Sequence, residues 1–530
     1  MKNIYHLTDN VSFKIFKITI DLDLSYENFN IDGQGYEILI KKNLKQIFLN
    51  LPNEKSLFIE IYENGNIIIY TPSLYRYPIY FKLLDSKLVL SNQVSCLFER
   101  DEVIKIEPFI FFRHLTGTPY PEENYFNELI LLKSSSKYIV RNKKLIYDSS
   151  LLNGGLSKSN SDAIDRISDV VNQSFSSANP ISILLSGGYD SRLNLVLAHH
   201  FSKKYGNKIK LYHEYKNRNE FEITKRVAEN FKLPITIIDR TTFLNKDERI
   251  FRDKDLIDLQ SGFYRENLVR WHKYLNWISI DNPGSIIWGL GVEAHKGKFY
   301  NYLDDIQDSI KVFGTKNNII EIARQSGIYN IENTENLFFN NLNNQTKEFK
   351  TLSSKIDFLH YHTYCAGFGK RGHDLFQNFN MSFPFLDPEF LQITFSLPRS
   401  EKENFKIVTD GIKRFSNSML NIPFTSGNEK SLMQKNRIIR LKDNFQNLIG
   451  NQKRKYFKRP SPKSNSFLKE YDIENILNYV PNSEVTLLLK ELLLGKWLNV
   501  TSIQLDYILQ SFYYLVYCEK EYKVSFVFNK

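Results

Sequence analysis

The sequence predicts a mixed α/β and α+β protein, with an antiparallel, sheet-rich N-terminal part followed by a parallel-sheet part with a helical extension. Hairpin signals repeat through residues 1–150, a Gly/Ser/Asn-rich linker occupies 150–160, and short apolar strands then alternate with helical patterns. The 530 residues exceed what one hydrophobic core usually holds, so we expect two or three domains.

The N-terminal part contains three candidate hairpins. Residues 56–72 form two β-rich runs around Asn64-Gly65, a strong turn signal, and residues 77–92 form a pair that turns near Asp85-Ser86. Residues 126–148 give further strands with a turn at Asn142-Lys143. This succession predicts antiparallel sheets.

Beyond the linker, strands and helices alternate, which predicts βαβ units and a parallel sheet. The first helix is expected over 161–178 with Ser161 as its N-cap, and the second ends near Gly206. Helical patterns dominate from about residue 300. The remaining expected elements are strands over 181–185, 208–215, 234–239 and 285–291, and helices over 192–206 and 220–233.

Composition excludes several classes of protein. With 42% hydrophobic residues the chain is not wholly disordered, and no apolar run approaches the length of a membrane span. Cys96, Cys365 and Cys518 are widely spaced, which fits buried thiols in a reducing compartment. The first ten residues lack the apolar core of a signal peptide, so we expect a cytoplasmic protein.

The formal net charge of +11 has two readings, an anionic partner or a Lys-rich composition without functional meaning. The most basic stretch, 435–463, holds ten Lys/Arg and one acid, Asp443. It predicts either a docking segment for an anionic partner or substrate peptide, or a solvated surface loop. Nucleic acid is not expected as the main partner.

The segment Ser186–Ser191, SGGYDS, follows the expected strand 181–185 and precedes a helix. Its glycines allow a tight turn close to an anion, and the free N–H groups and dipole of the helix favour a phosphate there. Asp190 repels phosphate directly, so its presence indicates a divalent cation between carboxylate and phosphates. A purely structural Gly-Gly turn is the alternative. The segment has neither the GxxxxGK[ST] nor the GxGxxG spacing.

The pattern S-G-G-x-D-S resembles the PP-loop of ATP pyrophosphatases, and the rest of the chain resembles the asparagine synthetase superfamily. The segments that carry the second resemblance are residues 66–98, the helix containing Glu220, IIWGLGVEAHKG, and SFPFLDPEFLQITFSLP. It implies a degenerate amidotransferase-like sandwich at 1–152 and a PP-loop synthetase domain at 160–530. The latter would have an adenine nucleotide α-hydrolase-like core at about 178–300 and a helical part at about 300–530.

Three departures separate the chain from a strict asparagine synthetase. Lys2 stands where the family's glutaminase has its Cys, so we expect no glutaminase activity. Glu293 stands at the metal-binding Asp and is followed by Ala294; a solvated loop acid is the alternative reading. Asn380 and Ser382 replace a Glu and an Arg. The likeness is then to relatives that keep the ATP chemistry without glutamine, such as β-lactam synthetases and lasso-peptide macrolactam synthetases.

The resemblance implies an ATP- and Mg²⁺-dependent amide ligase that adenylates a carboxylate, releases pyrophosphate and then AMP when an amine attacks. Its substrates are expected to be a small-molecule or peptide carboxylate and an amine, with a partner protein or precursor peptide as an open possibility. The implied sites are metal ligands Asp190 and Glu293, further catalytic residues Lys370 and Arg371, and nucleotide contacts Leu184, Ser186, Gly187, Gly188, Tyr189, Asp190, Ser191, Gly289 and Gly291.

Some assignments stay open at this point. His373 is either a base or a structural histidine, and the lysine that assists amide formation is Lys430, Lys490 or Lys496. The alternative functions are an RNA-modifying ATP pyrophosphatase, an ammonia-using asparagine synthetase, and a non-catalytic nucleotide-binding partner.

Overall fold

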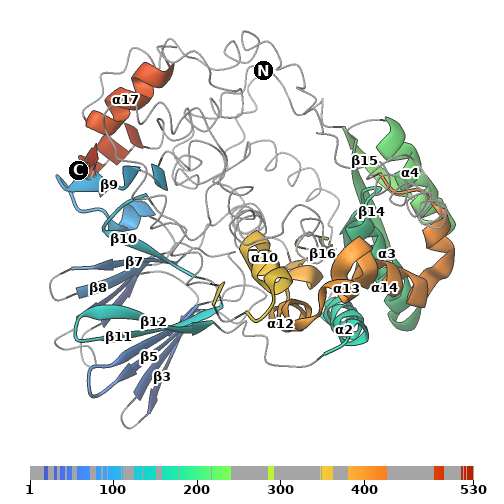
Figure 1. Cartoon of the computed structure of the whole chain (residues 1–530), viewed down its shortest axis with the longest axis horizontal. Helices are drawn as coiled ribbons and strands as arrows, with labels where there is room; N and C mark the ends of the chain where they lie inside the picture. Colours follow the sequence, from blue (N-terminus) through green and yellow to red (C-terminus); the bar gives the residue numbers. More distant parts are fainter. Residues whose placement is uncertain are drawn as a thin grey trace, which may run out of the picture.

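The computed structural model of the chain combines antiparallel sheets at one end with a parallel sheet at the other (Figure 1). This confirms the mixed α/β fold expected from the sequence. The residues that the structure describes are 17–21, 29–32, 36–41, 44–49, 57–71, 79–84, 87–91, 94–108, 110–111, 125–133, 135–150, 158–177, 180–215, 218–239, 284–289, 291, 346–347, 349–361, 380–425, 483–493, 512, 515–516, 518–520 and 522–528.

Two antiparallel sheets in the N-terminal part share one apolar core. Isoleucines from both sheets fill it, among them Ile18, Ile59, Ile69 and Ile79, each at most 1% exposed. In spatial order, one sheet contains β10 (Leu129–Leu132), β7 (Ile79–Leu83), β8 (Lys87–Ser91), β1 (Lys17–Asp21) and β2 (Phe29–Asp32). The other contains β12 (Lys144–Ser150), β11 (Ser136–Arg141), β6 (Ile67–Tyr70), β5 (Phe58–Tyr62), β4 (Leu44–Leu49) and β3 (Tyr36–Lys41).

The predicted hairpins are present. β5 pairs with β6 across Gly65, whose φ is +78°, and β11 pairs with β12 across Asn142 and Lys143, with φ of +49° and +54°. Two successive residues with positive φ are typical of the type I′ turn, whose twist matches that of the flanking strands. β7 and β8 also pair antiparallel, and their predicted turn at 85–86 lies outside the described residues.

The C-terminal residues return to this sandwich. β18 (Ser525–Phe528) pairs in parallel with β9 (Val103–Ile106), and α17 (Glu484–Leu493) packs against β18. Their apolar side chains join those of β7, β8 and β10 in a second core, which explains why these strands are buried on both faces. Figure 1 shows α17 beside β9, at the opposite end of the molecule from the parallel sheet. The predicted division at 152 and 160 stays a prediction.

The parallel sheet has the order β15-β14-β13-β16-β17, and all of its pairs are parallel. Its central strand is an apolar run buried along its length, as expected for a sheet covered on both faces. The strands are β13 (Ile181–Leu184), β14 (Ile209–Tyr215), β15 (Ile235–Asp239), β16 (Ser285–Ile287) and β17 (Asn380–Ser382).

The helices near this sheet pack mainly on one another. α2 contacts α3, α12 and α14, and α4 packs against β14. The N-cap predicted at Ser161 is wrong by two residues: Ser159 forms a capping box with Asp162, whose N–H donates to the Ser159 Oγ at 3.3 Å. The helices are α2 (Asn160–Ser177), α3 (Tyr189–Tyr205), α4 (Arg218–Asn230), α10 (Leu352–His360), α12 (Pro388–Ser396), α13 (Arg399–Lys402) and α14 (Lys406–Ser416).

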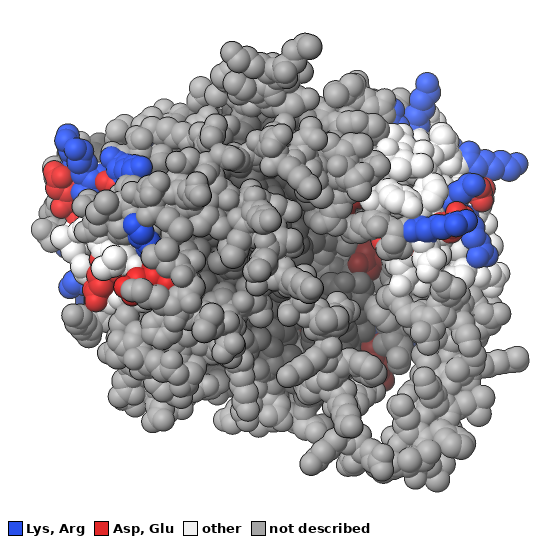
Figure 2. All heavy atoms as spheres, turned by 90° about the horizontal axis from the view of Figure 1, so that it is seen from above, with Lys and Arg blue, Asp and Glu red and all other residues white. Residues whose placement is uncertain are grey.

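Two surface properties bear on partners. Among the described helices, none combines the length and apolar composition needed to cross a bilayer. On the face seen in Figure 2, the described Lys and Arg side chains lie in two separate groups, each mixed with Asp and Glu.

Candidate functional site

The segment Ser186–Ser191 lies at the carboxyl end of β13, where the strand order of the parallel sheet reverses. From β13 the chain continues to β14 and β15 on one side, and later enters β16 and β17 on the other. In open α/β sheets the crevice at such a point is the usual ligand site. The segments that follow β13 and β16 therefore flank the candidate site.

Two serine hydroxyls close the segment into a compact loop. The Ser191 Oγ accepts a hydrogen bond from the Ser186 N–H at 3.0 Å and donates one to the Ser186 carbonyl oxygen at 3.0 Å. The two Oγ atoms are 3.1 Å apart, and the Gly188 N–H donates to the Ser186 Oγ at 3.3 Å. Hydroxyl and backbone donors thus gather at the start of α3.

The loop leads into α3 through Gly188, the N-cap residue, which has extended backbone angles and makes no side-chain cap. A helix start without a side-chain cap offers its N–H groups and the positive end of its dipole to an anion. At Gly187, a Cβ would collide with the Thr425 side chain and approach Ile223 Cγ2 to 3.1 Å. The two glycines therefore permit close packing behind the loop and an open helix end in front.

The segment after β16 packs directly on the loop. A Cβ on Gly289 would lie 2.9 Å from the Asp190 Cβ and 3.0 Å from the Ser191 nitrogen. Gly291 has a φ of +100°, which favours glycine, and a Cβ there would collide with Leu386. The structure thus brings the predicted nucleotide residue Gly289 against the predicted metal ligand Asp190.

Asp190 lies in the first turn of α3 and is half-buried. The other predicted catalytic residues, Glu293, Lys370 and Arg371, lie outside the described residues. Within the described ranges, no group of three or more His, Cys, Asp or Glu side chains could hold a metal ion. His373, Lys430, Lys496 and the basic stretch 435–463 also lie outside them.

The Tyr189 ring points away from solvent and is 3% exposed. It stacks between Phe405 and Phe424, with ring centroids 4.2 Å and 3.8 Å away and planes within 7° of parallel. Burial raises the pKa of its phenol to about 12. A contribution of Tyr189 to nucleotide binding is therefore confined to its backbone.

Four other residues named from the sequence lie at different places relative to the loop. Leu184 ends β13 and is 9% exposed, two residues before the loop begins at Ser186. Asn380 and Ser382 lie in β17, and the Trp288 N–H donates to the Ser382 carbonyl at 2.9 Å, so both positions are next to β16. Lys490, one of the three candidate assisting lysines, lies in α17, which packs against β18 of the sandwich.

Asp387, the acid of the PFLD motif, holds two helices together. It caps α12 by accepting from the Phe390 N–H at 2.9 Å. It also accepts two hydrogen bonds from Arg166 of α2, both 2.7 Å, and these hydrogen bonds raise the pKa of Arg166. The motif therefore joins α12 to α2.

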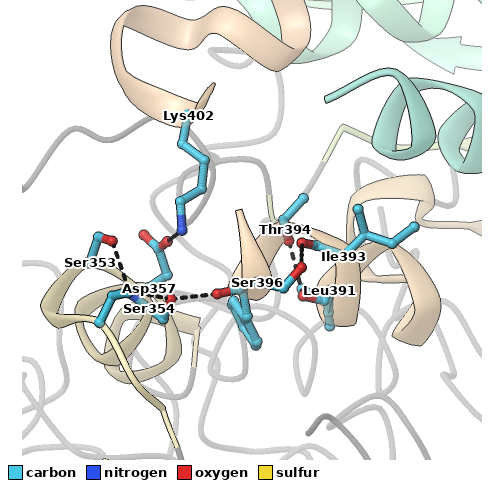
Figure 3. Close-up of polar contacts among 10 residues, drawn as sticks. Ser353, Ser354, Asp357, Leu391, Ile393, Thr394, Ser396 and Lys402 are labelled. Atoms are coloured by element: carbon cyan, nitrogen blue, oxygen red, sulfur yellow. Dashed lines mark hydrogen bonds and ion pairs between the residues drawn. The ribbon is translucent and has the colours of Figure 1, made fainter. Parts of the chain in front are cut away.

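A buried ion pair joins the helices next to α12 (Figure 3). The Lys402 Nζ lies 2.5 Å from the Asp357 Oδ2, and the two side chains are 0% and 3% exposed. One turn away, the Ser354 Oγ donates to the Phe395 carbonyl. These contacts tie α10 to α12 and α13, and sequence inspection did not single them out because the partners are 45 residues apart.

No family model and no curated protein sequence matches this chain. Among solved structures, it is similar to an NH3-dependent NAD synthetase from Campylobacter jejuni subsp. jejuni NCTC 11168 in complex with the nitrate ion. The identity is 14%, the match covers 40% of this chain and 96% of that chain, and the TM-score is 0.21. A TM-score this low does not establish a shared fold, so the family resemblance of the sequence stays a prediction.

Proposed function

We propose that the protein is an ATP-dependent, AMP-forming ligase that activates a substrate carboxylate and joins it to an amine. The observation that carries the proposal is the location of the SGGYDS loop. It lies at the carboxyl end of β13, at the reversal of strand order, with Gly289 packed against Asp190. The amide-ligase class, as opposed to nucleotide binding alone, rests on the resemblance of the sequence.

The loop suits the β- and γ-phosphates of ATP. The Ser186 hydroxyl and the uncapped start of α3 favour an anion, whereas the Ser186 N–H and the Ser191 hydroxyl donate within the loop and hold its shape. Glycine at 187 and 188 leaves no Cβ between the backbone and a bound phosphate. Gly289 brings the end of β16 to the same place, where an adenylate could lie across the crevice.

A bound magnesium ion would account for the carboxylate at this place. Asp190 supplies a hard carboxylate oxygen beside the phosphate cradle, where a carboxylate without a cation would repel the phosphates. We propose Asp190 and Glu293 as its ligands. When bound, Mg²⁺ would neutralise charge on the phosphates and favour departure of pyrophosphate.

The residues of this chain would act mainly by positioning and by stabilising charge. A carboxylate oxygen of the substrate attacks the α-phosphorus, the bond to the β-phosphate oxygen breaks, and pyrophosphate leaves on the loop. The amine then attacks the acyl carbon, loses a proton, and AMP departs with the electron pair of the broken acyl–oxygen bond. Lys370 and Arg371 are proposed as the cations that contact the phosphates.

The test is pyrophosphate release with Mg-ATP and pools of candidate small-molecule and peptide carboxylates. Asp190→Asn keeps the size of the side chain and removes its charge, so we expect release to fall by on the order of 100-fold. Asp169→Asn, on the exposed face of α2, is the matched control and should behave as wild type.

Equal pyrophosphate release by wild type and Asp190→Asn would contradict the role of the loop. ATP binding by the wild type without release on any carboxylate, or release that depends on RNA, would favour one of the alternative functions instead.

A further inference from the structure

A buried arginine lies behind the loop. Arg192, in the first turn of α3, is 0% exposed, and its guanidinium lies 3.7 Å from the centre of the Phe424 ring. Its hydrogen bonds go to backbone carbonyl oxygens: Nη1 donates to Met419 at 3.0 Å and Ile422 at 2.8 Å, and Nη2 donates to Pro423 at 2.6 Å and Gly187 at 3.3 Å.

These contacts join two distant segments. Met419, Ile422 and Pro423 belong to the segment 417–425 that follows α14, more than 220 residues beyond Arg192. Thr425 ends this segment, and its N–H donates to the Gly187 carbonyl at 3.2 Å. The Gly187 carbonyl therefore receives two donors from behind the loop, Arg192 and Thr425.

The orientation of this carbonyl fixes the orientation of the next N–H. In a planar trans peptide the carbonyl oxygen and the following N–H point in opposite directions. With the Gly187 carbonyl held toward Arg192, the Gly188 N–H points the other way, toward the Ser186 Oγ and the mouth of the loop. Two successive glycines have no Cβ to oppose a rotation of this peptide, so its orientation depends on these contacts.

We infer that Arg192 is a positioning residue that locks the Gly187–Gly188 peptide, so that the Gly188 N–H faces a bound anion. The anion is a pyrophosphate group, and this part of the inference rests on the proposed function. Arg192 would act through the backbone of the loop and would not touch the ligand.

The chemistry of the site supports a locking role over simple packing. Burial lowers the pKa of the Arg192 guanidinium, because desolvation penalises the charge. The acceptors that hold it are neutral carbonyls, so they satisfy the Nη1 and Nη2 donors without a compensating charge, and the buried Nε has no hydrogen-bond partner. An apolar side chain would fill the same space without this penalty, but it would leave the Gly187 carbonyl without one of its two donors.

The experiment compares wild type with Arg192→Met, Arg192→Lys and Arg226→Met. Lysine keeps the charge but has one nitrogen, which cannot span four carbonyls in two segments. Arg226 is an exposed arginine of α4 whose charge acts on Arg192, so Arg226→Met controls for a change of charge near the loop. Two readouts are used: hydrogen–deuterium exchange of peptides covering 184–192 and 417–425, and calorimetric binding of inorganic pyrophosphate with Mg²⁺.

We expect exchange in both segments to rise at least tenfold in Arg192→Met, while peptides covering 525–528 of the distant sandwich stay unchanged. Arg192→Lys should show the same pattern to a smaller extent, and it serves if Arg192→Met does not fold. The Kd for pyrophosphate should rise at least tenfold in both Arg192 variants and by less than twofold in Arg226→Met.

Each outcome decides a separate point. Wild-type exchange in both segments of Arg192→Lys, or wild-type pyrophosphate affinity in that variant, would overturn the inference, because charge alone would then suffice. If the wild type binds no pyrophosphate but exchange in the two segments rises together in Arg192→Lys, the lock holds while its anion-binding purpose and the proposed function fail.

Discussion

The antiparallel sandwich and the parallel-sheet region bury polar side chains in different ways. In the sandwich, Glu60 of β5 is 9% exposed and accepts hydrogen bonds from Gln46 on the neighbouring strand and from Tyr62 two residues away. In the parallel-sheet region, Arg192 and Lys402 each bind a segment far away in the sequence. The contacts of Glu60 stay within one sheet, whereas those of Arg192 and Lys402 join separate helices and loops, so that the helices and the candidate site depend on one another.

This difference predicts how far the effect of a lost contact spreads in each region. A lost contact in the sandwich should be felt within its own sheet. A lost contact around α3, α12 or α13 should also change the loop at the end of β13, because α14 packs on both α2 and α3. The predictions that follow test this contrast, from the largest expected effect to the smallest.

Lys402→Met should cause the largest loss of stability, because it leaves the Asp357 carboxylate buried without its cation. Removing one member of a buried pair costs about 3–5 kcal/mol. The matched variant in the sandwich is Lys82→Met, whose partner Glu102 is 18% exposed and stays partly hydrated, so we expect about 1–3 kcal/mol. Urea denaturation measures the free energy of unfolding of each variant, with hydrogen exchange in α14 and in β7 as the local readout. Equal losses of stability in Lys402→Met and Lys82→Met would contradict the difference between the two regions.

Asp387→Ala should have an intermediate effect, because it removes the cap of α12 and both hydrogen bonds from Arg166. A lost cap costs about 1 kcal/mol, and the lost charge-assisted hydrogen bonds add about 1.5–3 kcal/mol. Asp387→Asn retains an acceptor for the cap and should lose less. The thermal midpoint checks the order of the three proteins, and a midpoint of Asp387→Ala equal to that of wild type would rule out this role.

Tyr189→Phe should have the smallest effect, visible only at high pH. The phenol of the folded protein has a pKa of about 12, above its ordinary value of 10.0, because burial disfavours the phenolate. The unfolded chain therefore releases this proton first, and stability is lost as the pH rises from 10 toward 12. Thermal midpoints of both proteins from neutral pH to pH 12 should show a steeper alkaline decline for wild type; parallel curves would contradict the pKa.

The sequence predicted those features of the fold that have local signals. The hairpins at Gly65 and at Asn142-Lys143 follow from turn residues, and the alternation after residue 160 follows from periodicity. The return of β18 to β9 had no such signal, because parallel pairing between distant strands leaves no mark on either strand alone.

The candidate site was predictable to a similar degree. The motif identifies the loop, and the apolar strand before it gives its place at the end of β13. The partners of Arg192 and the stacking of Tyr189 on Phe405 and Phe424 depend on tertiary packing, so pattern alone could not find them. For this buried cluster the sequence offers a single clue, namely that an arginine, Arg192, directly follows the last serine of the motif, Ser191.

The pairing of β18 with β9 also sets an order of events during synthesis. β9 ends at Ile106, but its partner strand begins only at Ser525. At about 5–20 residues per second, the ribosome would need on the order of tens of seconds between the two strands. Throughout that interval the apolar face formed by β7, β8 and β10 lacks the side chains of α17 and β18 that cover it. A nascent chain would therefore expose this apolar sheet surface for the whole interval between the synthesis of β9 and that of β18.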